Sequence, residues 1–239
     1  AAHRPAFAAA AAAMGNVPIR PKAEQAEALR ASAEGACERA AEAILAADVL
    51  LLCTGAGWSA DSGLAVYRDI AKISAYAERD LDYKDICKPH WLKDSPELFW
   101  GFWGSCFNDY RETAPHAGYD VVARWRDAKF AAEVSAVGAR IRDRVEREEA
   151  VPSLEDLKIC EEAYDRPRRG PGAFFCYTSN VDAHAYDAFA AGELRECHGN
   201  VEVFQCGKEP RPCERSCWRA PTDAGFRFAV DAETMLAPE

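Results

Sequence analysis

The chain has 239 residues, of which 49% are hydrophobic and 28% are charged, so it can bury a sizeable core and is not wholly disordered. It carries 29 Lys and Arg against 39 Asp and Glu, a net charge of −10, which makes it a poor candidate for binding nucleic-acid phosphates. No apolar run approaches about 18 residues, so no membrane span is predicted. The length favours one large domain, or one domain with an insertion.

The N-terminal segment, residues 1–22, is rich in alanine and holds Arg4, Arg20 and Lys22 but no acid. This composition suits an organellar transit peptide and equally a low-complexity tail. Because the first residue is Ala1 rather than methionine, we expect a fragment or a processed chain.

Three kinds of element are predicted around two short apolar runs. Residues 24–47 are rich in Ala, Glu and Leu without proline, which predicts an amphipathic helix. Continuous apolar runs at 48–54 and 173–178 predict strands that are buried on both faces, as in a parallel sheet. The polar segments 55–63 and 179–182 follow these strands directly. Ligands of open α/β sheets bind at the carboxyl ends of the strands, so both segments are expected to line one crevice.

Two different stretches separate the strands. Residues 76–125 are rich in aromatic side chains, and four of them recur at helical spacing, which favours a helix that packs its aromatic face. These four are Phe99, Trp103, Phe107 and Tyr110. Residues 133–169 are densely charged with both signs, which predicts a solvated helix, and the loop 167–172 ends it.

A strand followed by Gly-x-Gly at the start of a helix is a general phosphate-binding pattern, because the backbone can approach the anion closely and free N–H groups face it. Gly55, Ala56, Gly57 and Ser59 occupy these positions. The next glycine is Gly63, so the full dinucleotide fingerprint is absent. An ordinary tight turn that uses glycine for its backbone angles is the alternative.

Further polar residues follow the two strands. Tyr67 and Arg68 come after the glycine-rich segment, and an aromatic ring beside a guanidinium can cover a sugar and contact phosphate. Asn180 and Asp182 follow the second strand. His198 stands before a glycine in a later loop and is a candidate general base, with a structural histidine as the alternative.

The ten cysteines do not suggest a disulfide scaffold, which is usually shorter and denser in cysteine. Reduced thiols in an intracellular compartment are predicted instead: cytoplasm, nucleus, or an organelle if residues 1–22 are a transit peptide. Seven cysteines are interpreted as packing or surface thiols. The other three, Cys206, Cys213 and Cys217, gather in a polar loop that contains proline.

Taken together, five motifs in order resemble the sirtuin family of NAD-dependent protein deacylases over about residues 40–220, and most closely a divergent, bacterial-type branch. They are Gly55-Ala-Gly-Trp-Ser59, Asp61-Ser-Gly63 with Tyr67-Arg68, Pro115-His116, Thr178-Ser-Asn-Val-Asp182, and Glu196-Cys-His-Gly199 followed by the cysteine cluster. The resemblance implies an α/β fold with a Rossmann-like parallel sheet and a small helical and zinc-ribbon-like module.

The same resemblance implies a domain organisation. Residues 23–239 would form a sirtuin-type catalytic domain that is incomplete at its C-terminus. Within it we expect a helical module at 70–125, a charged insertion at 133–169 and a partial zinc-binding module at 201–239.

The resemblance also implies an activity and residue roles. The acyl oxygen of an acyl-lysine protein would attack the anomeric carbon of NAD, and the products would be nicotinamide, free lysine and O-acyl-ADP-ribose. His198 would be the general base, Asn180 would position the ribose or a water, and Asp182 would bind the nicotinamide carboxamide. Tyr67 and Arg68 would cover the nicotinamide ribose. The other NAD-binding positions would be Gly55, Ala56, Gly57, Ser59, Ser62, Gly63 and Ser179.

Departures from the family leave alternatives open. Ser179 replaces the usual glutamine and Ala183 the usual glycine. Sirtuins hold one structural zinc ion with two cysteine pairs. Cys206 with Cys213, or with Cys217, would be the first half of that site, and an empty cysteine cluster is the alternative. The alternative functions are NAD-dependent mono-ADP-ribosyl transfer, nicotinamide release to water, and a non-catalytic NAD- or metal-binding module.

Overall fold

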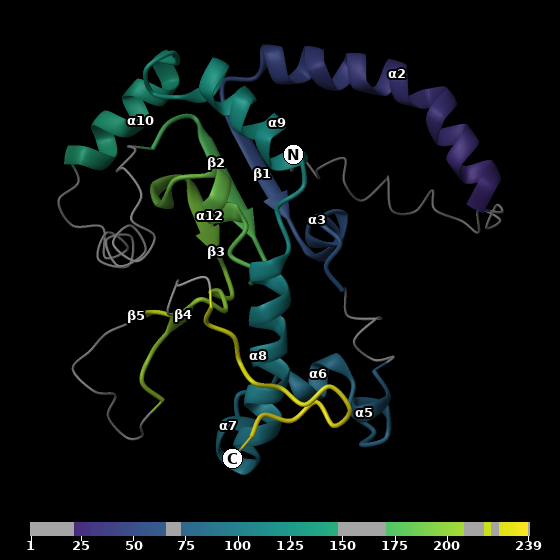
Figure 1. Ribbon diagram of the computed structural model, residues 1–239. Helices are drawn as coiled ribbons and strands as arrows, with labels where there is room; N and C mark the ends of the chain where they lie inside the picture. The colour runs from purple at the N-terminus through teal and green to yellow at the C-terminus, as the bar shows by residue number, and fades with distance from the viewer. Residues whose placement is uncertain (1–21, 66–72, 148–170, 208–217, 221–224, 239) are drawn as a thin grey trace, which may run out of the picture. The chain divides into compact units, whose positions relative to one another are not determined.

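The computed structural model describes residues 22–65, 73–147, 171–207, 218–220 and 225–238 (Figure 1). The chain divides into two compact units, residues 1–47 and 48–239. In the first unit, α2 (Lys22–Ala46) confirms the helix expected over 24–47, since its alanine-rich sequence favours helix. No helix in the described parts of either unit is both long and apolar enough to cross a bilayer.

A three-stranded parallel sheet forms the centre of the second unit. Its strands are β1 (Leu50–Thr54), β2 (Phe174–Thr178) and β3 (Leu194–Glu196), in the order β1-β2-β3. Thr54 pairs with Thr178, and Thr178 pairs with Glu196. All three strands therefore end at one edge, which confirms the predicted α/β fold with a parallel sheet.

One face of this sheet is covered in the described part of the second unit, which corrects the prediction of strands buried on both faces. The Phe174 ring is buried and lies 5.0 Å from the Phe189 ring. Tyr119 packs on the other side of Phe189, at 6.1 Å. On the opposite face Leu51 is 60% exposed and Tyr177 is 46% exposed. The sequences of the two apolar runs do not predict that one face is exposed, because apolar or aromatic residues point to both faces of the sheet.

Helices of the second unit lie beside the sheet and beyond both of its ends (Figure 1). They are α3 (Ala56–Asp61), α5 (Ser74–Ala77), α6 (Tyr83–Ile86), α7 (Trp91–Asp94), α8 (Pro96–Glu112), α9 (Gly118–Trp125), the π-helix η1 (Arg126–Phe130), α10 (Ala136–Arg147), α12 (Ala185–Ala188) and the 3₁₀-helix η2 (Ala191–Glu193). α10 confirms helix within the charged stretch, and the part of that stretch from residue 148 lies outside the described residues.

α8 confirms the helix predicted from the aromatic spacing. It begins with Pro96, whose missing N–H has no intrahelical role in the first turn. Its buried Phe102 packs with Tyr76, Ile86 and Leu98 in a core between the short helices. This core holds α5 and α6 against α8.

The C-terminal segment 225–238 lies along another face of α8. A Cβ atom at Gly101 would collide with the Met235 carbonyl, and one at Gly104 would lie 2.7 Å from Phe228 Cβ. Asn108 fixes the segment, because its side chain exchanges two hydrogen bonds of 3.0 Å with the Phe228 backbone. The glycines therefore permit this close packing.

A two-stranded antiparallel pair borders the cysteine cluster. β4 (Val203–Phe204) precedes Cys206, and β5 (Trp218–Arg219) follows Cys217. Val203 pairs with Arg219, and Glu202 accepts hydrogen bonds of 3.0 and 2.8 Å from the Arg219 guanidinium. The two ends of the cysteine-bearing loop are thus held together.

Candidate functional site

The glycine-rich turn connects β1 to α3 at the carboxyl edge of the sheet. Gly55 is extended, with φ −153°, and α3 begins at the next residue. The first N–H groups of any helix lack intrahelical partners. A Cβ atom on Gly57 would meet no atom within 4 Å, and Gly63 has φ +93°, which favours glycine. Open space thus lies beside the start of α3, as a phosphate cradle requires.

The polar loop after β2 is joined to this turn by hydrogen bonds. Thr54 Oγ1 donates to Thr178 Oγ1 at 2.7 Å, and Thr178 Oγ1 also accepts from the Asn180 backbone N–H at 3.1 Å. The Ser179 N–H donates to the Thr54 carbonyl at 3.2 Å. These bonds fix the loop at the strand ends, so Ser179 and Asn180 lie beside the glycine-rich turn.

Asp182 is the most strongly anchored polar side chain of this loop, and it is 5% exposed. Ser59 Oγ donates to Asp182 Oδ2 at 2.5 Å, and the His184 N–H donates to Oδ1 at 3.1 Å. Each carboxylate oxygen has a second lone pair, so Asp182 can still accept from a ligand. Ala183 has φ +63°, where the family's glycine would be unstrained and alanine costs about 1–2 kcal/mol.

Replacing Ser59 with alanine is expected to lower the free energy of unfolding by about 2 kcal/mol, because a buried carboxylate loses a charge-assisted hydrogen bond. Urea denaturation of the variant measures this change. Ser74→Ala, at an exposed position in α5, is the matched control and should change stability little. Equal stability of both variants would contradict the role given to the Ser59–Asp182 bond.

His198 lies on the loop after β3 and is exposed. The Cys197 N–H donates to the Thr178 carbonyl at 3.0 Å, and the Val201 N–H donates to the Val181 carbonyl at 3.0 Å. The loop that carries His198 is therefore held against the loop after β2 on both sides of the histidine.

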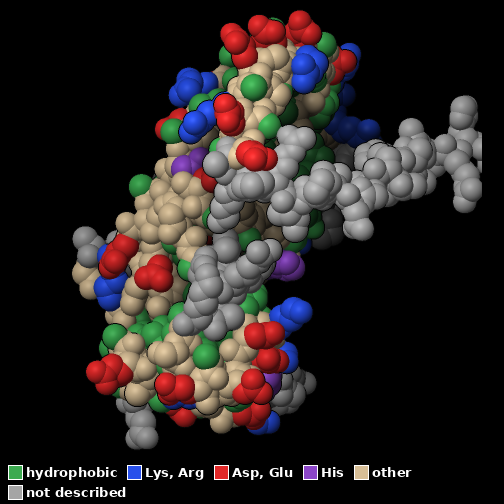
Figure 2. Space-filling model, turned by 90° about the vertical axis from the view of Figure 1, so that its right-hand side faces the viewer, with side chains coloured by type: hydrophobic (Ala, Val, Ile, Leu, Met, Phe, Trp, Pro, Cys, Tyr) green, Lys and Arg blue, Asp and Glu red, His purple; other side chains and the backbone are tan. Residues whose placement is uncertain are grey.

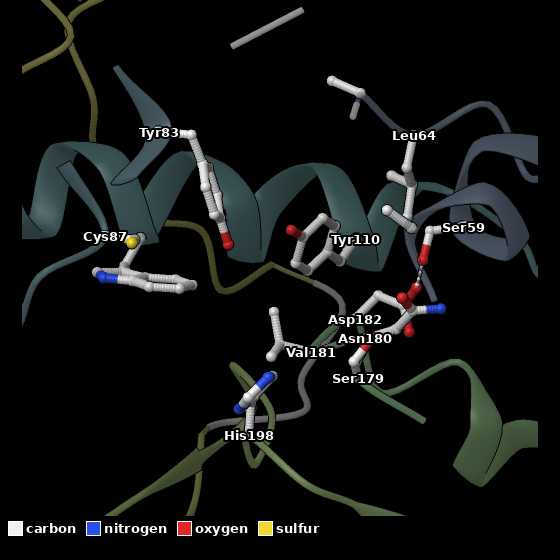
Figure 3. Close-up of a pocket in the computed structure, with 13 residues that line it drawn as sticks. Ser59, Leu64, Tyr83, Cys87, Tyr110, Ser179, Asn180, Val181, Asp182 and His198 are labelled. Atoms are coloured by element: carbon white, nitrogen blue, oxygen red, sulfur yellow. Dashed lines mark hydrogen bonds between the residues drawn. The ribbon is translucent and has the colours of Figure 1, made fainter. Parts of the chain in front are cut away.

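These elements enclose a cavity of about 420 Å³. Its lining consists of Ala56, Ser59, Leu64, Ala65, Tyr83, Cys87, Trp103, Tyr110, Ser179, Asn180, Val181, Asp182 and His198. Figure 3 shows Ser59 and Asp182 on one side and Tyr83 and Cys87 on the other, with Tyr110 between them and His198 at the lower edge of the group. The cavity thus has a polar end and an aromatic end, and the exposed histidine lies at its rim.

The structure brings together six of the predicted site residues: Ala56, Ser59, Ser179, Asn180, Asp182 and His198 all line this cavity. None of the three glycines is in the lining: Gly55 lies in the turn before α3, Gly57 in α3 and Gly63 directly after its C-cap. Ser62 has another role, since its Oγ accepts the His116 N–H at 3.0 Å. Tyr67 and Arg68 lie outside the described residues.

The aromatic end of the cavity was missed by the sequence reasoning. Trp103 and Tyr110 of α8 and Tyr83 and Cys87 of α6 form it. The seven-residue spacing of Trp103 and Tyr110 places them on one helix face, which was the available signal. Burial raises the pKa of Tyr110, and burial also raises the pKa of the Cys87 thiol. Both groups are therefore uncharged at neutral pH.

The proposed zinc ligands are only partly described. Cys206 follows β4 and is partly buried, while Cys213 and Cys217 lie outside the described residues. Within the described ranges no three His, Cys, Asp or Glu side chains gather as a metal site would require. The half-site at Cys206 and Cys213 stays a prediction.

Comparison with known proteins was made by sequence and by structure. No family model matches the chain. An NAD-dependent protein deacylase of Deinococcus radiodurans is 28% identical over 166 residues, which is 68% of this chain and 50% of that protein. One of Mycolicibacterium paratuberculosis is 32% identical over 98 residues, 41% of this chain and 39% of that protein. The chain therefore spans about half the length, or less, of these curated relatives.

Two solved structures are similar at low identity. One is a sirtuin structure that was solved to explain substrate affinity. It matches with a TM-score of 0.41 and 16% identity, and the match covers 73% of this chain and 52% of the sirtuin chain. The other is a Sir2 homologue with a histidine-to-asparagine substitution, in complex with ADP-ribose. It matches with a TM-score of 0.40 and 17% identity, and the match covers 79% of this chain and 57% of the homologue. Over part of its length the chain is therefore similar in sequence to two curated proteins that are named NAD-dependent protein deacylases, the activity of the family that its motifs resemble.

Proposed function

We propose that this protein is an NAD-dependent protein-lysine deacylase that transfers the acyl group to ADP-ribose and releases nicotinamide. The observation that carries the proposal is the hydrogen bond between Ser59 and Asp182. It joins the glycine-rich turn after β1 to the polar loop after β2, on the cavity that His198 also lines. Both curated relatives are named NAD-dependent protein deacylases, which supports the same activity.

The polar end of the cavity fits NAD. Asn180 is 8% exposed, and its Nδ2 atom is a buried donor with no hydrogen-bond partner among the described residues. A buried donor of this kind is costly unless a ligand accepts from it. The open space at Gly57 admits a phosphate beside the backbone N–H groups at the start of α3.

Each cavity residue can then be given a task. NAD supplies an anomeric carbon that accepts the acyl oxygen as nicotinamide leaves. Asn180 Nδ2 donates to a ribose hydroxyl or a water, and Asp182 accepts from the nicotinamide carboxamide. His198 accepts the proton of a ribose hydroxyl so that this oxygen can attack the acyl carbon. Gly55, Ala56, Gly57, Ser59, Ser62, Gly63 and Ser179, with Tyr67 and Arg68, complete the proposed NAD site.

The substrate is proposed to be an acyl-lysine protein or peptide. The uncharged aromatic end, with Tyr83 and Trp103, suits the methylene chain and acyl group of such a residue. Figure 2 shows acidic side chains around the lower helices of the second unit with Lys and Arg side chains among them. Exposed acids of this stretch, Glu78, Asp80 and Asp82, alternate with the exposed Arg79 and Lys84 close to Tyr83, so both signs of charge are available to a peptide substrate there.

Zinc is proposed for the cysteine loop, with Cys206 and Cys213, or Cys217, as thiolate ligands. The paired strands β4 and β5 hold the two ends of that loop together, as a closed structural site needs. The ion would stabilise the loop and take no part in the reaction.

Mass spectrometry of the products formed from NAD and an acetyl-lysine peptide tests the proposed activity. We expect nicotinamide, deacetylated peptide and O-acetyl-ADP-ribose in equal amounts. ADP-ribosylated protein without O-acetyl-ADP-ribose would replace this proposal with mono-ADP-ribosyl transfer. Binding of NAD without any turnover would replace it with a non-catalytic NAD-binding module.

A further inference from the structure

His198 is carried by a tight turn that begins at Glu196 and ends at Asn200. Gly199 has φ +70°, a conformation that glycine adopts without strain. The Gly199 N–H donates to the Glu196 carbonyl at 3.2 Å, which closes the backbone of the turn.

A side-chain bond closes the same turn a second time. Asn200 Nδ2 donates to Glu196 Oε2 at 2.5 Å. Asn200 Oδ1 accepts from the backbone N–H groups of Glu202 and Val203, at 3.0 and 3.1 Å. Asn200 therefore connects the carboxyl group before His198 to the start of β4, and the histidine lies inside this connection.

Glu196 is an unfavourable residue for a purely structural contact. Its Oε1 atom is buried and has no hydrogen-bond partner among the described residues. Burial, with the nearby charges of Asp182 and Glu202, raises the pKa of Glu196 to about 8. Glutamine could accept the same bond from Asn200 without any charge, and neutral replacements of buried charges are often stabilising. A costly group of this kind is often retained for function.

The groups around Glu196 define what its ionisation would do. From the loop after β2 it faces Asp182, and from the segment before β4 it faces Glu202. The Arg219 guanidinium pairs with Glu202 at 2.8 Å, and Arg111 lies 3.9 Å from it, so Glu202 is largely neutralised. Cys176 of β2 is a thiol whose pKa burial raises to about 12. Asp182 accepts hydrogen bonds from Ser59 and from the His184 N–H, and its Oδ2 lies 3.9 Å from His184 Nδ1, with no Lys or Arg paired to it among the described residues. It is therefore the carboxylate that an ionised Glu196 would repel, with His198 on the same turn as Glu196.

We propose that Glu196 and Asn200 are positioning residues that fix the turn which presents His198 to the cavity. This inference rests on the proposed deacylase function. It adds that the carboxyl group performs this task while protonated, because a second negative charge beside Asp182 would loosen the turn. Glu196 belongs to a motif that carries the family resemblance, but the resemblance gives neither Glu196 nor Asn200 a role, and neither residue lines the cavity.

Steady-state deacetylation by Glu196→Ala, Asn200→Ala and Glu196→Gln, measured from about pH 6 to 9, tests the proposal. Glu196→Ala and Asn200→Ala should lower kcat about tenfold and leave the Kd for NAD within about threefold, because a misplaced base slows the chemistry but not binding. Glu196→Gln should keep most of kcat at pH 7. It should also lack the fall in kcat that we expect for the unsubstituted protein above about pH 8, where Glu196 ionises.

Thermal unfolding separates misfolding from misplacement of the histidine. The pKa of Glu196 in the folded protein, about 8, lies above its ordinary value of 4.5. Between these two pH values Glu196 is ionised in the unfolded chain but protonated in the folded protein, so the free energy of unfolding falls as the pH rises. Glu196→Gln should therefore raise the Tm at pH 8 and leave it unchanged at pH 4. Glu146→Gln, at an exposed acid of α10, is the control for removing one negative charge and should change neither the Tm nor kcat.

The outcomes distinguish this inference from the function on which it rests. Absence of turnover by the unsubstituted protein would overturn the proposed function, and this inference with it. Normal turnover with an unchanged kcat in folded Glu196→Ala would overturn the positioning role alone. The positioning role would also be overturned if the kcat of Glu196→Gln were as low as that of Glu196→Ala, or if the kcat of Glu196→Gln still fell above pH 8.

Discussion

Replacement of His198 by alanine is expected to lower kcat for deacylation at least about 100-fold while the Kd for NAD stays within about threefold. The size of this fall in kcat follows from the loss of a general base, because general acid–base catalysis typically accelerates a reaction by about 10²–10⁴-fold. Binding should persist because the anchored polar groups, Ser59, Asn180 and Asp182, lie on other loops. Nicotinamide release measures the first quantity, and calorimetric titration with NAD measures the second.

The matched control for this variant is His90→Ala, which removes an exposed imidazole that contacts the Trp91 ring at 4.6 Å, away from the cavity lining. It should leave both kcat and NAD affinity near those of the unsubstituted protein. Unchanged turnover in His198→Ala would remove this residue from its role as the base. A large loss of NAD affinity would instead make it a binding residue.

Replacement of Glu193 by alanine should lower the free energy of unfolding by about 1–3 kcal/mol, because the buried Arg126 guanidinium loses one of two carboxylate partners and keeps Asp127, whose Oδ1 lies 2.9 Å from its Nε. Glu193 is 0% exposed and Arg126 is 7% exposed, and their Oε2 and Nη1 atoms lie 3.1 Å apart. Arg126 Nη1 also donates to the Ala188 carbonyl at 2.9 Å. The pair thus ties η1 to the segment between β2 and β3, and equilibrium urea denaturation measures its loss.

A double variant tests whether the unpaired charge is the cause. Adding Arg126→Met to Glu193→Ala removes the buried guanidinium that has lost the Glu193 carboxylate and should recover part of the lost stability, because both buried charges of the pair are then absent. Additive losses in the two single variants and the double variant would show that the residues contribute independently.

Much of the polar end of the site could be predicted from the sequence, because its determinants are local. The apolar run before Gly55 forms β1, the run before Ser179 forms β2, and both loops follow from turn chemistry at the strand ends. His198 also came from a local pattern, a histidine before a glycine. Parallel pairing then brings these separate loops together, since both strands end at one sheet edge.

Other features depend on contacts between distant segments. β3 is three residues long, and its pairing with β2 rather than its composition makes it a strand. Phe107 and Tyr110 share the helical spacing of α8, yet Phe107 is 1% exposed in the core while Tyr110 lines the cavity. Helical periodicity places both rings on one helix but does not say which of them meets a neighbouring segment.

By itself, the sequence determined the two longer strands, the helices around them and the polar groups at the strand ends, because apolar runs, glycines and short polar loops act over a few residues. Only the tertiary structure decided that the sheet is covered on one face, that Tyr83, Cys87, Trp103 and Tyr110 line the cavity, and that the carboxyl group of Glu196, with its Oε1 atom buried, lies near Asp182. The burial of a side chain and the electrostatic potential around it depend on residues that are far apart in the sequence, so a local sequence pattern cannot predict them.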